Sequence, residues 1–532
     1  MAAKKSTKKE KTVTLEEKLW QTAEQLRGPL ESAQYKYIAL GLMFIKFISD
    51  RFEERRTQID KDTRDTKSKI YCKKDSERDY FLNEKEEYHR KNIPFLRKGT
   101  RWEDLKNAAK KENLGIKIDK MLLDIENDNP ILVGVMPRVF ADSNIPNENL
   151  QELVNFFSGI GFGGKDLTDT DSFGRAYEYF IKKFAKNEGH RGGEFYTPRS
   201  IVKLIVEILE PFEGKIYDPT CGSGGMFVQS LRFLDEHQNV KKKNIALYGQ
   251  DIKDNVWRIA KMNLILRSID STNVVLGDSL KNDKFPKLKA NFIMANPPFN
   301  FKEWGHAQLK DDKRWKYGTP SDSKAGGNYA FMQHMISHLD ENSGELGLVL
   351  ANGSMSVGGN EGDIRKNIIE DDRIDCMIAM PTNLFYTVTI PACLWFITKN
   401  KNDGKTPNRS GKTLFIDARK IFTKVDKVLN ELTDEQIDKI AGTYRSFIGE
   451  KGAPKYKDVA GYCKVATKEE IAKNNYVLTP GRYVGAEEIE DDGEPFEEKM
   501  KRLTTEYAKL SEESKKLDKE IRKNLKEIGF EI

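Results

Sequence analysis

The chain of 532 residues is long enough for about three or four domains at roughly 150 residues each. Hydrophobic residues make up 38% and charged residues 32%, with a net charge of +6, so a disordered chain and a disulfide-dense miniprotein are both excluded. The most apolar stretch, Tyr37 to Ile48, is interrupted by Lys46 and is far shorter than the roughly 20 residues that a bilayer requires. Because the lysine-rich start has no apolar run behind it, we expect no secretory signal and a protein that stays inside the cell.

The cysteines and histidines give no metal-binding pattern. The five cysteines contain no CxxC pair, which argues against a disulfide framework and against a zinc site. His334 and His338 are four residues apart, but the rest of an HExxH motif is missing. We therefore interpret this pair as part of a surface or core helix and expect no bound metal.

Residues 1–155 are predicted to form an N-terminal helical domain. Thr14 followed by Glu17 is typical of a capping box, and leucine and phenylalanine recur at helical spacing from there to Arg56. The rest of this region is charged and helix-prone, and it is interrupted where asparagine and proline stand close together, at 92–94, 129–130 and 144–146. A glycine cluster at 159–164 indicates the boundary with the next domain.

Residues 156–485 are predicted to form an α/β domain. Seven short apolar runs are strand candidates: Ile216–Tyr217, Ile245–Tyr248, Asn273–Leu276, Phe292–Ala295, Leu346–Leu350, Ile374–Ala379 and Ala392–Thr398. Helical patterns lie between the first five, at 224–237, 254–267, 328–340 and less clearly at 284–290, which favours a parallel sheet covered on both faces. The last two candidates have no clear helix between them, so we expect them to pair antiparallel.

Residues 486–532 are predicted to form a C-terminal helical tail with coiled-coil spacing. Its regular seam, in steps of four and three, consists of Phe496, Met500, Leu503, Tyr507, Leu510, Ser514, Leu517, Ile521, Asn524 and Ile528. Two interpretations are open: a solvated terminal helix that docks on its own chain, and a helix that pairs with a partner chain for subunit assembly.

The first chemical signal is a glycine loop, Asp218-Pro-Thr-Cys-Gly222-Ser223-Gly224-Gly225, directly after a predicted strand and at the start of a helix. Glycines allow the backbone to approach a ligand at the carboxyl end of a strand, and the helix N-terminus offers free N–H donors. A plain glycine turn is the alternative. Asp251 follows the next strand, where a carboxylate commonly accepts ribose hydroxyls, and the absence of GxGxxG favours a nucleoside without phosphates over NAD.

The second signal is Asn296-Pro297-Pro298-Phe299, directly after the strand candidate that ends at Ala295. Two prolines fix the backbone and remove N–H donors, so the loop is suited to accept hydrogen bonds. The Asn296 side-chain oxygen and the Pro297 carbonyl would accept both hydrogens of a planar amine such as adenine N6, which would direct its lone pair at a methyl donor. Phe299 offers a flat face for a base extruded from the duplex. A bland proline turn is the alternative.

Together these motifs resemble those of the S-adenosylmethionine-dependent amino-methyltransferases, specifically the modification subunit of type I restriction-modification systems. The resemblance covers nearly the whole chain and implies a Rossmann-like, seven-stranded methyltransferase sheet. It also implies catalysis by the NPPF loop and cofactor contacts along the chain. The residues so implied in cofactor binding are Glu194, Phe195, Tyr196, Thr197, Pro198, Arg199, Asp218, Gly222, Ser223, Gly224, Gly225, Asp251 and Asp278. Asp251 stands where the family has a glutamate.

The resemblance further implies adenine-N6 methylation of double-stranded DNA in the prokaryotic cytoplasm. Sequence recognition would come from a separate specificity subunit, with two copies of this chain per specificity subunit and an optional restriction nuclease subunit. NPPF also occurs in enzymes that methylate protein glutamine or ribosomal RNA, so these remain alternatives, as does a non-catalytic DNA-binding scaffold. No membrane partner is expected.

The segment from Phe301 to Lys324 combines lysines and an arginine with aromatic residues directly after the NPPF loop. Cations beside aromatic rings suit a phosphate backbone and a displaced base. We therefore predict contact with DNA here, and an ordinary surface loop is the alternative. The aromatic members are Trp304, Trp315 and Tyr317, and the basic members are Lys302, Lys310, Lys313, Arg314, Lys316 and Lys324.

Overall fold

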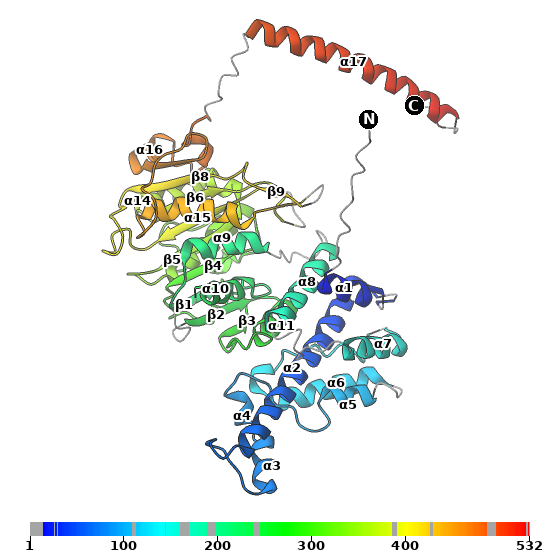
Figure 1. The fold of residues 1–532 in the computed structure, drawn as a ribbon. Helices are drawn as coiled ribbons and strands as arrows, with labels where there is room; N and C mark the ends of the chain where they lie inside the picture. Colours follow the sequence, from blue (N-terminus) through cyan, green and yellow to red (C-terminus); the bar gives the residue numbers. More distant parts are fainter. Residues whose placement is uncertain are drawn as a thin grey trace. The chain divides into compact units, whose positions relative to one another are not determined.

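A computed structural model describes residues 14–25, 27–28, 30–108, 113–143, 145–159, 170–188, 197–237, 245–385, 391–425, 429–486, 496–527 and 530 (Figure 1). The chain divides into two compact units, Met1–Val484 and Gly485–Ile532. Within the described ranges, no helix combines the length and the apolar character needed to cross a bilayer.

The N-terminal region is helical, as predicted, and no strand occurs in its described residues. Its helices are α1 (Leu15–Gln25), α2 (Ser32–Arg64), α3 (Asp75–Asn83), α4 (Glu86–His89), α5 (Trp102–Ala108), α6 (Leu114–Asp128), the 3-10 helix η1 (Pro130–Leu132) and α7 (Asn147–Ser158). The long helix α2 buries the predicted apolar stripe, including Leu40, Phe44 and Phe47. The break at Asn129 has a clear cause, because its side chain both accepts from and donates to the Phe95 backbone, at 2.7 and 2.9 Å.

Two further helices, α8 (Thr170–Glu188) and α9 (Arg199–Leu209), come before the sheet. Helix α8 packs against α1 and α2. Glu178 on α8 accepts a hydrogen bond from Arg267 Nη2 at 2.8 Å, just beyond helix α11 (Asp254–Ile265). Asn255 at the start of α11 donates to the Tyr37 hydroxyl of α2 at 2.7 Å. These contacts fix the helical region against the sheet region within the first unit.

The sheet has nine strands in the order β11-β8-β6-β7-β5-β4-β1-β2-β3. The strands are β1 (Gly214–Asp218), β2 (Ile245–Asp251), β3 (Val274–Leu276), β4 (Phe292–Ala295), β5 (Glu345–Ala351), β6 (Ile374–Ala379), β7 (Ala392–Thr398), β8 (Lys412–Asp417) and β11 (Cys463–Thr467). All seven predicted strands are present. Strand β7 is antiparallel to β5 and β6, which confirms the antiparallel prediction.

Helices cover both faces of this sheet (Figure 1). Side chains alternate along each strand, so Ile216 and Met294 belong to one core while Tyr217 and Ile293 belong to the other. Helices α9, α10 (Gly225–Glu236) and α15 (Asp434–Ile448) pack on the first face, and α13 (Lys324–His338) and α14 (Gly359–Glu370) pack on the second. The predicted α/β fold with a doubly covered sheet is therefore confirmed.

Two local expectations need correction or extension. Residues 284–290 form turns and a bridge, and no helix connects β3 to β4. After the seventh predicted strand, β8 and β11 extend the sheet, and β9 (Thr423–Lys424) pairs with β10 (Asn430–Glu431) as a short separate ladder. The remaining short elements are α12 (His306–Leu309), η5 (Asn352–Met355), α16 (Lys468–Lys473) and η6 (Pro480–Arg482).

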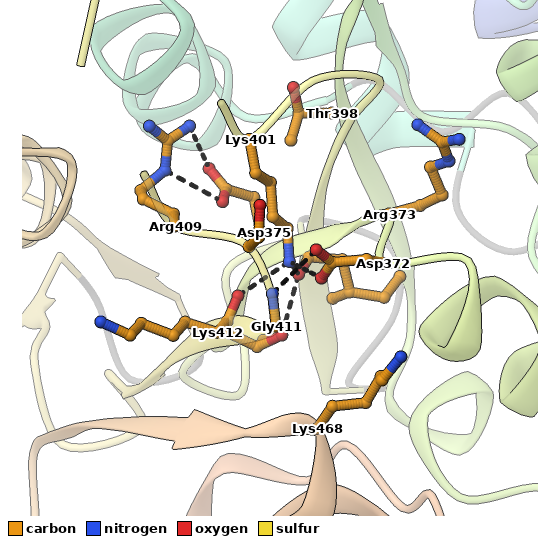
Figure 2. A network of polar contacts seen from close by, with 12 residues as sticks. Asp372, Arg373, Asp375, Thr398, Lys401, Arg409, Gly411, Lys412 and Lys468 are labelled. Carbon is orange, nitrogen blue, oxygen red and sulfur yellow. Dashed lines mark hydrogen bonds and ion pairs between the residues drawn. The ribbon is translucent and has the colours of Figure 1, made fainter. Parts of the chain in front are cut away.

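A network of charged side chains, drawn in Figure 2, joins residues at the start of β6 to residues around the start of β8. Because β6 and β8 are parallel, this end of the strands is opposite their carboxyl ends. Arg409, on the loop before β8, forms two hydrogen bonds to Asp375, whose side chain is 1% exposed. Lys401 donates to Asp372 at 2.7 Å and to the carbonyls of Ile374 and Lys412. The loop that joins β7 to β8 is thus held against the sheet by charges that have partners.

The second unit contains helix α17 (Phe496–Glu527). Six members of the predicted seam are exposed at 43% or more, namely Met500, Leu503, Tyr507, Leu510, Leu517 and Ile521. Ile528 lies outside the described residues. An apolar stripe of this length is what a second helix would cover, either from this chain or from a partner chain.

Removal of Arg409 should destabilise the fold strongly. Arg409→Met leaves Asp375 buried without its cation, so the free energy of unfolding should fall by about 3–5 kcal/mol in chemical denaturation. The exposed neighbour variant Lys412→Met should change it by less than about 0.5 kcal/mol. Asp375→Asn in the Arg409→Met background should recover part of the loss, and a double variant no more stable than Arg409→Met would contradict the explanation by uncompensated charge.

Candidate active site

A cavity of about 590 Å³ opens at the carboxyl edge of the parallel strands. Its wall is formed by the turns after β1, β2 and β3, by the loop after β4, and by helices α2, α8 and α11. Seven of the residues predicted for the cofactor site and the NPPF loop line it: Gly222, Ser223, Asp251, Asp278, Asn296, Pro298 and Phe299. The fold therefore brings together motifs that are up to 77 positions apart, from 222 to 299.

The glycine loop connects β1 to α10. Gly222 and Gly224 have φ values of +53° and +78°, in the left-handed region that side chains disfavour, which explains glycine at both positions. The Cys221 N–H donates to the Gln250 carbonyl at 3.1 Å and so attaches the loop to β2. The backbone beside the cavity is therefore fixed in place.

Two carboxylates close the neighbouring turns. Asp251 accepts the Gly222 N–H at 3.0 Å through Oδ2 and the Lys253 N–H at 2.9 Å through Oδ1. Asp278 accepts the Leu280 N–H at 2.9 Å and the Lys281 N–H at 3.0 Å. Because a carboxylate oxygen has two lone pairs and Asp251 lines the cavity, Asp251 is a candidate acceptor for hydroxyl groups of a ligand.

Asp218 has a different position from the one implied by the sequence. The residue is 2% exposed, does not line the cavity and accepts the Thr220 N–H at 2.9 Å through Oδ1. Burial, and then the nearby Asp251, raise the pKa of Asp218 to about 8. At neutral pH the carboxyl of Asp218 is thus mostly protonated.

The loop after β4 presents an open acceptor. Asn296 Nδ2 donates to Thr197 Oγ1 at 2.9 Å, which holds the amide in one orientation. Asn296 Oδ1 is buried at the cavity and has no hydrogen-bond partner among the described residues. A buried acceptor without a partner costs about 1–3 kcal/mol, so this oxygen is a candidate acceptor for a ligand that donates hydrogen.

Phe299 and Asn300, further along the same loop, are held in place by neighbouring side chains. The Phe299 ring is half-buried and meets Phe385 edge to face, with ring centroids 5.9 Å apart. Asn300 has a positive φ of 56° and exchanges two hydrogen bonds with Asn328 on α13, at 2.9 and 3.0 Å. The loop is therefore fixed in place, and Phe299 lines the cavity.

The predicted segment before α9 is only partly visible. Glu194, Phe195 and Tyr196 lie outside the described residues. Pro198 is buried at the N-cap of α9 and Arg199 is exposed, and neither lines the cavity. Pro297, Gly224 and Gly225 belong to the two cavity loops but do not line the cavity themselves.

The aromatic part of the basic segment is not available for stacking. Trp304, Trp315 and Tyr317 are at most 8% exposed and belong to the core below the loop, so the expectation that their rings meet a displaced base is wrong. Arg314 also points inward, whereas Lys302, Lys310, Lys313 and Lys324 are exposed. Which of these side chains are buried and which are exposed depends on tertiary packing, and the composition of the segment does not indicate it.

The helical region contributes two residues to the cavity wall that were not predicted from the sequence. Lys36 on α2 and Ile181 on α8 line the cavity, and the Lys36 residue is only 5% exposed. Ile252, which follows Asp251, is 59% exposed and adds an apolar wall. The helical pattern around Lys36 indicated a buried helix but contained no sign of which neighbour it meets.

The histidine pair lies in the core, as the helix interpretation allowed. Asp283, His334 and His338 have ligand atoms within 4.8 Å of one another. However, His334 Nδ1 accepts from the Arg314 guanidinium at 2.9 Å, and its Nε2 faces the Tyr217 hydroxyl at 3.1 Å. Because both ring nitrogens are engaged and one neighbour is a cation, this arrangement does not suit a metal ion.

Comparison with known proteins gives a consistent result. The family model N-6 DNA Methylase matches residues 168–492, and the HsdM N-terminal domain matches residues 15–157. The methylase subunit of the type I restriction enzyme MjaIX of Methanocaldococcus jannaschii is 41% identical over 98% of this chain and 92% of its own. The HindI methylase subunit of Haemophilus influenzae is 45% identical over 74% of this chain and 89% of its own.

A solved structure agrees. The type I restriction-modification methyltransferase subunit from Streptococcus thermophilus is 25% identical, with a TM-score of 0.72 over 88% of this chain and 99% of that one. The fold thus belongs to the methyltransferase class. The chain is a member of the N-6 DNA methylase family and is a methylase subunit of the type I restriction-modification kind.

The buried carboxyl of Asp218 should make stability depend on pH. Its folded-state pKa of about 8 lies above the ordinary value of 3.8, so its stabilising contribution is complete below about 4 and is lost as pH rises through 8. Asp218→Asn cannot ionise, and the decline of the unfolding free energy between pH 5 and pH 9 should therefore be smaller in the variant. Denaturant titrations across this range measure both slopes, and equal slopes would contradict the assignment.

Proposed function

We propose that this chain transfers a methyl group from S-adenosylmethionine to adenine N6 in double-stranded DNA, as part of a type I restriction-modification complex. The observation that carries the proposal is the buried Asn296 oxygen, an acceptor held open at the cavity by the bond from Asn296 Nδ2 to Thr197. The family description and the two relatives at 41% and 45% identity support it.

The cavity fits a nucleoside cofactor. Asp251 offers acceptors for ribose hydroxyls, Asp278 and the apolar Ile252 lie beside it, and the glycine loop allows close backbone approach. We assign Thr197 and the neighbouring residues 194–199 to the methionine end on the resemblance alone. When bound, S-adenosylmethionine supplies an activated methyl group on a sulfonium.

The chain's own residues would prepare the target amine. Asn296 Oδ1 and the Pro297 carbonyl accept the two N6 hydrogens, which withdraws the lone pair from the ring and turns it toward the cofactor end of the cavity. Phe299 stacks on the extruded adenine, and Pro298 keeps the loop rigid. No metal is required in this scheme, since positioning and hydrogen bonding do the chemical work.

We propose that sequence recognition comes from a separate specificity subunit, with two copies of this chain per specificity subunit and an optional restriction nuclease subunit. The exposed seam of α17 supports a helix-pairing surface for that assembly. The exposed lysines after the catalytic loop support contact with DNA phosphates. The prokaryotic origin of the relatives supports a cytoplasmic location.

The other functions considered have less support. A protein-glutamine or ribosomal RNA methyltransferase would share the NPPF loop, but the relatives named above are restriction methylases, and the first of them matches nearly the whole chain. A non-catalytic scaffold would have no need for an open acceptor at the cavity.

Asn296→Ala should abolish methyl transfer while leaving cofactor binding nearly unchanged. The variant removes one of the two acceptors aimed at the amine, so the rate should fall by at least about 100-fold for a lost positioning group. The assay is labelled methyl transfer to duplex DNA by the complete complex, with N6-methyladenine identified by mass spectrometry and cofactor affinity measured by calorimetry. Asn402→Ala, in an exposed loop after β7, is the matched control.

Substantial transfer by Asn296→Ala would refute the assigned role of this residue. A methyl group found on cytosine, RNA or protein in the parent reaction would refute the proposed substrate. Phe299→Ala should weaken binding of the extruded base by about 1–3 kcal/mol, and Phe299→Trp should retain part of the activity because the stacking face remains.

Leu510→Asp should prevent assembly with the specificity subunit. The charge would lie in the middle of the exposed α17 seam and would be buried by a partner helix, whereas Glu512→Ala changes the opposite side of the same helix. Size-exclusion chromatography of the mixed subunits measures assembly, and cofactor binding should be normal in both variants. Full assembly by Leu510→Asp would show that the seam serves this chain alone.

A further inference from the structure

Arg314 lies on the segment that follows the catalytic loop, but its side chain turns inward and is 13% exposed. Nε and Nη2 donate to the two carboxylate oxygens of Asp312 at 2.9 and 2.7 Å. Nη2 also donates to the Leu280 carbonyl at 2.6 Å, and Nη1 donates to the Ser279 carbonyl at 3.3 Å and to His334 Nδ1 at 2.9 Å. These five contacts use all five N–H groups of the guanidinium.

Two of the acceptors belong to the cofactor end of the cavity. Ser279 and Leu280 directly follow Asp278, whose carboxylate closes the same turn. The Ser279 hydroxyl also donates to the Pro219 carbonyl at 2.5 Å, next to the glycine loop. Asp278, Ser279 and Pro219 all line the cavity. Arg314 therefore holds, from behind, the backbone that faces the proposed cofactor.

The contact with His334 connects Arg314 to β1, the strand that leads into the glycine loop. A guanidinium can only donate, so His334 Nδ1 is the acceptor and Nε2–H is left to donate to the Tyr217 hydroxyl at 3.1 Å. Tyr217 is the residue before Asp218 on β1. Burial, followed by the neighbouring His338 and Arg314, holds the pKa of His334 well below its usual value, in agreement with the neutral ring.

We infer that Arg314 is a positioning residue that joins the target-side segment 301–324 to the cofactor-side turn at Asp278–Leu280. A ligand that restrains the turn therefore also restrains the segment beside Asn296 and Phe299. The inference rests on the proposed function, since the ligand meant is S-adenosylmethionine. It assigns to Arg314 a role inside the protein in place of the DNA contact expected from the sequence.

The geometry requires arginine in particular. Its planar fork reaches two carbonyls, a carboxylate and an imidazole at once, whereas a lysine has three donors on a single nitrogen. Arg314→Lys thus keeps the charge and removes the connection. Lys313→Met, at the exposed neighbouring position, removes a charge and keeps the connection.

The test is amide hydrogen exchange of the full chain with and without S-adenosylhomocysteine, an unreactive probe of the cofactor site. In the parent and in Lys313→Met, bound probe should slow exchange in peptides from 305 to 318 by at least about fivefold, and in Arg314→Lys by less than about twofold. Calorimetry gives the probe affinity of each variant so that occupancy is matched. Thermal unfolding shows whether each variant is folded.

Asp312→Asn is a milder second variant, because it weakens two of the five contacts and leaves the carbonyl contacts in place. It should show intermediate protection, and it carries the test if Arg314→Lys does not fold. Equal protection in Arg314→Lys or Asp312→Asn and the parent would overturn the inference, as would a parent that binds the probe without protection of 305–318. A parent that does not bind the probe would overturn the proposed cofactor, and with it this inference.

Discussion

The site depends on the parallel pairing of β2, β1 and β4. Asp218 of β1 pairs with Gly249 of β2, and Tyr217 pairs with Ile293 of β4, so the three strands end at the same edge. Because side chains and loops at the carboxyl ends of parallel strands converge, this register brings the glycine loop, Asp251 and the loop at Asn296–Phe299 around one cavity. The hydrogen bond between Gly222 and Asp251 follows from the same register.

Buried polar groups are paired differently at the two ends of the strands. Where β6 and β8 begin, Asp375 has Arg409 and the Tyr444 hydroxyl as partners, and Lys401 has three acceptors. At the cavity, Asn296 Oδ1 is left without a partner among the described residues. Buried charges with partners fix one edge, and the open acceptor at the other is the one that we propose a ligand uses.

Much of the fold was predictable from local pattern. The seven strands predicted from short apolar runs are all present in the structure, because strands buried on both faces appear in the sequence as continuous apolar runs. The strands β8 and β11 were not among the seven candidates, and residues 284–290 form turns and a bridge where a helix was predicted less clearly, since irregular connections have little periodicity. Residue types at the glycine loop and at Asn296–Phe299 led to the proposed chemistry, which stays a prediction.

By itself, the sequence determined the fold class, the family motifs and the loops that carry them, since these depend on residue type, spacing and backbone preference. Only the tertiary structure decided what each side chain meets. It turned Arg314 and the rings of Trp304 and Trp315 inward, because apolar burial and five hydrogen bonds outweigh exposure to solvent. It also brought Lys36 of the helical region to the cavity wall, a contact between distant parts of the chain that no local pattern records.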